Sequence, residues 1–165
     1  MNHIRTEVAP AYAATKKPLV VDEDVIIAQA LSILASRIRH TDALTSPDLV
    51  QKYLTVLLSG RPDEHFGCIY LDNQHRVIDT EELFRGTIDG ASVYPRVVVR
   101  HCLEANAAAV IFFHNHPSGV NTPSDADRLI TTRLKQALNL VDIRVLDHLI
   151  VGGITTCSFA EQGLI

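Results

Sequence analysis

Two histidines, a serine and an aspartate stand at spacings that can gather a metal ion. His114 and His116 end a strongly apolar run, and side chains two apart on a strand point to the same face. Ser124 and Asp127 follow a short turn-forming segment, and residues three apart at the start of a helix are neighbours. Two imidazoles and one carboxylate leave a fourth coordination position open, as in a catalytic zinc site. The sequence therefore predicts one zinc ion per chain, held by His114, His116 and Asp127.

Water activation also needs a proton carrier, and Glu64 stands at the start of an expected neighbouring strand. A carboxylate at this place can take a proton from the attacking water and later deliver it to the leaving amine. Ser124 can donate a hydrogen bond to the oxyanion that develops on the attacked carbonyl. The expected chemistry is hydrolysis of an amide or isopeptide bond, with Glu64 and Ser124 as the catalytic residues.

The set Glu64, then His114-x-His116-x7-Ser124-x2-Asp127, resembles the signature of JAMM (MPN-plus) metalloproteases. The resemblance implies that the two histidines and Asp127 are zinc ligands, that Glu64 is the general acid and base, and that Ser124 stabilises the oxyanion. The wider sequence resembles the bacterial RadC-like branch of that superfamily over roughly residues 46–163. The stretches that carry this resemblance are Glu64-His65-Phe66, Leu83-Phe84-Arg85-Gly86-Thr87, Tyr94-Pro95-Arg96, His114-Asn115-His116-Pro117-Ser118-Gly119, Pro123-Ser124 and Leu146-Asp147-His148.

Two departures from that branch stand in the sequence. Val97 occupies a position that is often acidic there, with no consequence for the metal ligands. Longer RadC proteins carry a helix-hairpin-helix region, and nothing in residues 1–45 resembles one. We therefore expect a short form that consists of the catalytic domain, and DNA binding is not carried over from the longer proteins.

Helical and strand patterns alternate along the chain and must position these residues. They predict an α/β fold, a single three-layer domain with a central mixed β-sheet flanked by helices. The resemblance implies a cytidine-deaminase-like JAB/MPN architecture. Residues 1–20 are expected to be a flexible arm, 21–45 an N-terminal helix and 46–165 the JAB/MPN domain. The expected helices begin near Asp22, Pro47, Pro95 and Pro123, and the expected strands cover about 64–72, 76–87, 107–113 and 141–152, with a last capped turn at 158–161.

Composition limits the partners and the compartment. The chain has 165 residues, 47% of them apolar, and a formal net charge of −4, with no cluster of basic residues for phosphates. We expect no nucleic acid partner and no membrane span, because no apolar run approaches the length of a spanning helix. Three dispersed cysteines (Cys68, Cys102 and Cys157) and the lack of a secretory signal favour the cytoplasm. The expected partner is a peptide or an isopeptide-linked protein substrate, and the oligomeric state stays open.

Simpler roles remain open for each site residue. The histidine pair can be surface residues at a loop, and Asp127 can complement the helix dipole. Ser124 can merely support the helix start, and Glu64 can be a solvated residue at a strand end. His148 is either a satisfied core histidine or a group that steadies a metal ligand.

Two other functions compete with hydrolysis. Many domains of the superfamily lack the metal and act as scaffolds, so a RadC-like accessory or binding domain with weak or no intrinsic activity is the alternative. The DNA-repair label attached to RadC suggests nucleic-acid processing, and the letters His-Asn-His invite comparison with HNH nucleases. Those nucleases distribute their residues over a ββα unit, so the contiguous letters are a coincidence, and the acidic charge disfavours this class.

Overall fold

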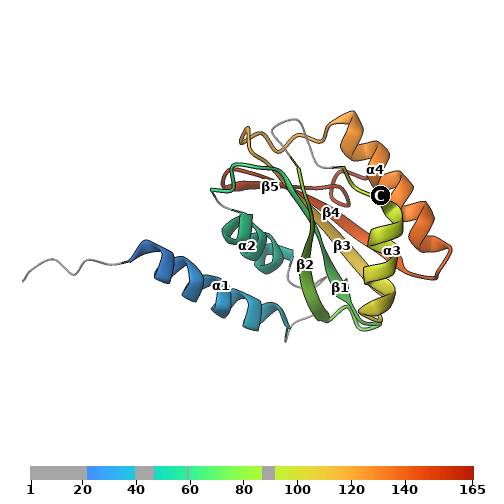
Figure 1. Cartoon of the computed structure of the whole chain (residues 1–165), viewed down its shortest axis with the longest axis horizontal. Coiled ribbons are helices and arrows are strands. Elements are labelled where there is room, and N and C mark those ends of the chain that lie inside the picture. Colours follow the sequence, from blue (N-terminus) through green and yellow to red (C-terminus); the bar gives the residue numbers. More distant parts are fainter. Residues whose placement is uncertain (1–21, 40–46, 59, 87–91) are drawn as a thin grey trace, which may run out of the picture.

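The computed structural model describes residues 22–39, 47–58, 60–86 and 92–165 (Figure 1). Five strands form one sheet in the order β2-β1-β3-β4-β5. Their bounds are β1 His65–Leu71, β2 Val77–Arg85, β3 Ala109–His116, β4 Arg144–Gly152 and β5 Thr155–Ser158. β3 and β4 are parallel and the other pairs are antiparallel, so the sheet is mixed. The parallel pair lies at the centre and leads into the predicted site.

Helices cover both faces of this sheet. α2 (Pro47–Leu58) packs on one face, and α3 (Pro95–Glu104) and α4 (Asp125–Asn139) pack on the other (Figure 1). The predicted α/β class and its three layers are therefore confirmed. β1 is buried along its whole length and β3 up to its last residue, because both of their faces are covered, whereas much of the edge strand β2 is exposed.

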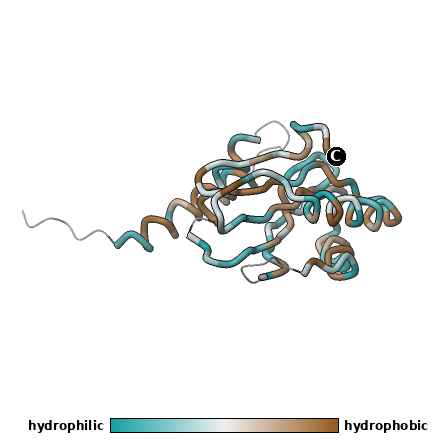
Figure 2. Tube along the Cα trace, turned by 90° about the horizontal axis from the view of Figure 1, so that it is seen from above, coloured by the Kyte–Doolittle hydropathy of each residue, from teal (hydrophilic) through white to brown (hydrophobic). Residues whose placement is uncertain are grey.

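α1 (Glu23–Arg39) contacts the body through its C-terminal half. Ile38 is buried against α2, whereas Ile27 is 47% exposed. The N-terminal turns of α1 extend away from the rest of the described structure (Figures 1 and 2). The expected arm at 1–20 lies outside the described residues. Every helix in the described ranges is too short or too polar to span a bilayer.

The last element differs from our expectation. We predicted only a capped turn at 158–161. In the structure a tight turn at Gly153 comes first, and Thr155–Ser158 then forms a strand that pairs with β4. A four-residue strand is too short for its hydrophobic period to show in the sequence. The expected turn follows it, with the Glu161 amide donating to the Ser158 hydroxyl at 3.1 Å.

Candidate metal centre

β3 directs His114 and His116 to the face of the sheet that α4 covers. Phe112 packs in the cluster under α3 and α4, whereas Phe113 packs in the cluster under α2. Because side chains alternate along a strand, His114 and His116 continue the face of Phe112. β3 extends through His116, beyond the predicted end at Phe113, so both imidazoles are held by a regular strand. His114 is 1% exposed, and His116 lies half-buried at the strand end.

The start of α4 holds the carboxylate. Ser124 is the N-cap residue with extended backbone angles, and Asp127 is the third helical residue. The Asp127 amide donates to the Ser124 hydroxyl at 3.1 Å, and Asp127 Oδ2 accepts from the Ser124 amide at 2.7 Å and hydroxyl at 2.6 Å. This reciprocal capping box fixes the helix start and also the orientation of the carboxylate.

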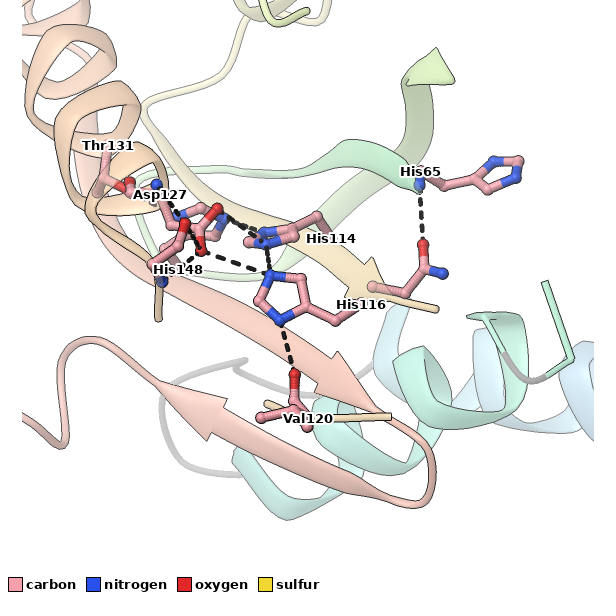
Figure 3. A network of polar contacts seen from close by, with 9 residues as sticks. His65, His114, His116, Val120, Asp127, Thr131 and His148 are labelled. Carbon is pink, nitrogen blue, oxygen red and sulfur yellow. Dashed lines mark hydrogen bonds and ion pairs between the residues drawn. The ribbon is translucent and has the colours of Figure 1, made fainter. Parts of the chain in front are cut away.

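The three predicted ligands converge (Figure 3). The two Nε2 atoms of His114 and His116 are 2.9 Å apart. Asp127 Oδ1 lies 3.2 Å from the first of these nitrogens, and Oδ2 lies 3.4 Å from the second. A zinc tetrahedron with bonds of about 2.0–2.1 Å has edges of about 3.3–3.4 Å. The two nitrogen–oxygen distances are close to such edges, whereas the nitrogen–nitrogen distance is shorter, and the group can hold a metal ion.

A buried hydrogen-bond chain sets the tautomer of His114. The Thr131 hydroxyl donates its one proton to the Asp127 carbonyl at 2.5 Å, so it must accept from His148 Nδ1, 2.7 Å away. His148 is fully buried, and this burial lowers its pKa well below the ordinary value, with the nearby His114 adding to the effect. Neutral His148 thus presents a bare Nε2, which accepts from His114 Nδ1 at 2.8 Å. The Nε2 lone pair of His114 is left facing the ion position.

The carbonyl of Val120, in the loop after β3, sets the tautomer of His116. His116 Nδ1 lies 2.6 Å from the Val120 carbonyl, which can only accept, so this nitrogen carries a proton. The loop packs closely on β4 because Gly152 has no side chain there. A Cβ at Gly152 would lie 2.6 Å from the Asn121 amide nitrogen and 2.7 Å from the Val120 carbonyl carbon. In its neutral form His116 also presents a bare Nε2, so two lone pairs and a carboxylate then face one position that a cation can occupy.

The pKa shifts of Asp127 and His116 are consistent with a site that binds a cation. Burial alone would raise the pKa of the Asp127 carboxyl, but the adjacent imidazoles of His114 and His116 outweigh burial and hold the pKa well below its usual range. The contact with the Asp127 carboxylate, which favours a protonated imidazole, in turn raises the pKa of His116, against the effect of its partial burial. Asp127 is therefore ionised at neutral pH, as a metal ligand must be.

Glu64 lies beside the triad, in the residue that precedes β1. Its side chain lines the same cleft and makes no hydrogen bond or ion pair to any described residue. Its backbone is held on both sides by the buried Asn115. Asn115 Oδ1 accepts from the His65 amide at 2.8 Å, and Nδ2 donates to the Asp63 carbonyl at 3.0 Å. The carboxylate is thus free while the chain that carries it is fixed.

The structure brings all five predicted site residues to one cleft, and their assigned roles stay predictions. Asn115 and Thr131 are two further residues of the site that the sequence alone did not predict. Thr131 follows Asp127 by four residues on the same helix face, which is a readable signal. Asn115 gave no signal beyond its place between two histidines. His148 is both fully buried and bonded to His114, so its two proposed roles are compatible.

We expect that Thr131→Val weakens zinc binding about 10- to 100-fold, the usual effect of losing a partner of a metal ligand. Valine removes the acceptor of His148 Nδ1–H, so the tautomers of His148 and His114 are no longer held. The neighbouring Thr132, whose exposed hydroxyl donates to the Arg128 carbonyl, provides the matched control Thr132→Val. Competition titration with a chromophoric chelator measures both variants. Equal zinc affinity in the two would show that the chain of hydrogen bonds does not support the ligand.

Comparison with known proteins agrees with this geometry. Residues 44–164 match the family model of the RadC-like JAB domain. The UPF0758 protein of Nitrosococcus oceani is 60% identical over 132 residues, which cover 80% of this chain and 59% of that protein. A UPF0758 protein of Vibrio cholerae is 53% identical over 154 residues, covering 93% of this chain and 98% of the relative.

The chain therefore spans about three fifths of the length of some relatives and nearly all of another. The family match covers most of the chain and includes every residue of the metal centre. The chain belongs to the RadC-like JAB domain family.

Proposed function

We propose that this protein is a zinc-dependent hydrolase of peptide or isopeptide bonds. The observation that carries the proposal is the convergence of the two Nε2 atoms of His114 and His116 and the Asp127 carboxylate, with distances of 2.9–3.4 Å between them. The group opens onto a cleft of about 580 Å³ that Glu64 and Ser124 also line. A three-residue donor set beside a cleft leaves room for water and substrate, unlike a closed structural site.

A bound zinc ion supplies a Lewis acid that polarises a carbonyl and makes water acidic enough to ionise near neutral pH. The residues of the chain do the rest. Glu64 takes the proton of the attacking water, since its carboxylate has no competing partner among the described residues. It then passes that proton to the leaving amine, which departs neutral.

Ser124 is proposed to stabilise the oxyanion. Its hydroxyl proton points at Asp127 Oδ2 in the capping box, 2.6 Å away. When that oxygen serves as a ligand, the hydroxyl is free to turn toward the cleft and donate to the substrate. The Asp127 amide still donates to the Ser124 oxygen, so the helix start is retained.

The partner proposed for this site is a peptide or an isopeptide-linked protein. A net charge of −4 disfavours nucleic acid, and the three cysteines are all free and buried, in keeping with the proposed cytoplasmic location. One zinc ion per chain is expected from the single donor group found in the described residues.

We expect the purified protein to contain about one zinc per chain, since the described part of the chain holds one such donor group. Phenanthroline should abolish cleavage of responsive peptides in a broad screen, and added zinc should restore it. The control is the non-chelating isomer of phenanthroline, which should leave cleavage unchanged. Metal content is measured by elemental analysis. Cleavage that survives complete metal removal would refute the proposal.

A binding role without turnover is the second candidate. The capping box favours this role, because Ser124 and Asp127 hydrogen-bond to each other at the start of α4. These two residues therefore have a structural function that does not depend on a substrate. This candidate predicts a chain that binds zinc but cleaves nothing in the same screen.

A further inference from the structure

The cleft beside the metal triad continues along α4 to Arg133. On α4, Leu129 and Ile130 lie between Asp127 and Arg133, and the apolar side chains of Val93 and Tyr94 also line the cleft. Tyr94 is 57% exposed and Leu129 is 63% exposed. Large apolar side chains gathered beside a polar site form a surface that a ligand can cover. The cleft therefore has a metal end, an apolar middle and a cationic end.

Arg133 is the one lysine or arginine among the described residues that line this cleft. Its guanidinium is exposed and makes no ion pair or hydrogen bond within the described ranges. Its neighbours one turn away on α4 carry no carboxylate. Five other arginines, by contrast, each pair with a carboxylate: Arg39, Arg61, Arg76, Arg85 and Arg100. A free guanidinium fork matches the geometry of a carboxylate.

The position of Arg133 sets the length of what it can bind. Arg133 follows Asp127 by six residues, which is about 9 Å along the α4 axis. An extended peptide advances about 3.3 Å per residue. A segment whose cleaved bond lies at the triad therefore brings its second or third neighbouring residue to Arg133.

We propose that the cleft selects peptide segments that carry a carboxylate two or three residues from the cleaved bond. Arg133 binds that carboxylate, and Tyr94 and Leu129 contact the apolar side chain between. The inference rests on the proposed hydrolytic function. An aspartate or glutamate side chain and a free C terminus offer the same chemistry, so both belong to the proposed class.

Binding can be tested without turnover in zinc-loaded Glu64→Gln protein. The probes are a positional library of short peptides, each made with a C-terminal carboxylate and with a carboxamide, and with glutamate or glutamine at each position. We expect selection of glutamate at one position or of free C termini, and the selected arm identifies the source. Adding Arg133→Gln should weaken the preferred peptide about tenfold. Adding Lys135→Gln, an exposed residue of α4 outside the cleft, should not.

The outcomes separate this inference from the proposed function. Equal binding of carboxylate and amide peptides, or a preference that survives Arg133→Gln, overturns the inference. Cleavage of the same peptides by the parent protein without a carboxylate preference overturns it too, and leaves the proposed function standing. Carboxylate-dependent binding that needs Arg133, with no cleavage by the parent, contradicts the proposed function and overturns the part of the inference that concerns a cleaved bond, and leaves Arg133 only as a site that binds carboxylates.

Discussion

Asp127→Asn should leave the protein without stoichiometric zinc and lower hydrolysis about a thousandfold or more, because several kcal/mol of transition-state stabilisation depend on the metal. The carboxylate supplies the negative charge of the triad and faces both Nε2 atoms, at 3.2 and 3.4 Å. A neutral carboxamide removes that charge but keeps one oxygen to accept from the Ser124 amide. Zinc content by elemental analysis and peptide cleavage are the measurements.

The control for this substitution is Asp125→Asn. Asp125 is exposed in the same first turn of α4 and does not line the cleft. The one role that it shares with Asp127 is therefore the favourable interaction with the helix dipole. Losing part of the capping box costs about 1 kcal/mol in the free energy of unfolding, so both variants should stay folded. If the two variants hold zinc equally well, Asp127 is not a ligand.

Local rules of the chain predict most of this metal centre. The alternation of a strand places His114 and His116 on one face, and the helix period places Ser124 beside Asp127. Both rules act over a few residues, so they need no knowledge of the rest of the fold. The apolar run before His114 marks the central strand for the same reason. The metal donors lie at the end of β3 and the start of α4, and the short loop between these two elements brings them together.

What the sequence left undetermined depends on contacts between distant segments. Glu64 reaches the site because β1 pairs with β3 in a register that sets Phe66 opposite His114. No local period specifies that register, and a slip by one residue would turn the whole strand over. The contact between Asn115 and the backbone around Glu64 spans about fifty positions of sequence. The bond between His148 and His114 likewise needs β4 to lie beside β3.

Glu64→Gln should retain zinc and lower the turnover number about 100- to 10,000-fold, the range expected for losing a general acid and base. Glutamine has nearly the same shape but cannot accept the proton of the attacking water. The fold should not change, because the Glu64 side chain bonds to none of the described residues. Glu161→Gln, an exposed change far along the chain, serves as the control. Hydrolysis by Glu64→Gln at the parental rate would exclude the assigned role.

Asn115 is expected to position Glu64, because its two hydrogen bonds hold the backbone on either side of that residue. Asn115→Ala should bind zinc normally and lose about tenfold or more in turnover, since a small misplacement of a reacting group is costly. In the Glu64→Gln background the same change should cost nothing further, because Asn115 acts through the carboxylate that is already gone. Asn139→Ala, at the exposed end of α4, is the matched control. An additional loss in the double variant would mean that Asn115 supports the reaction by a route that does not pass through Glu64.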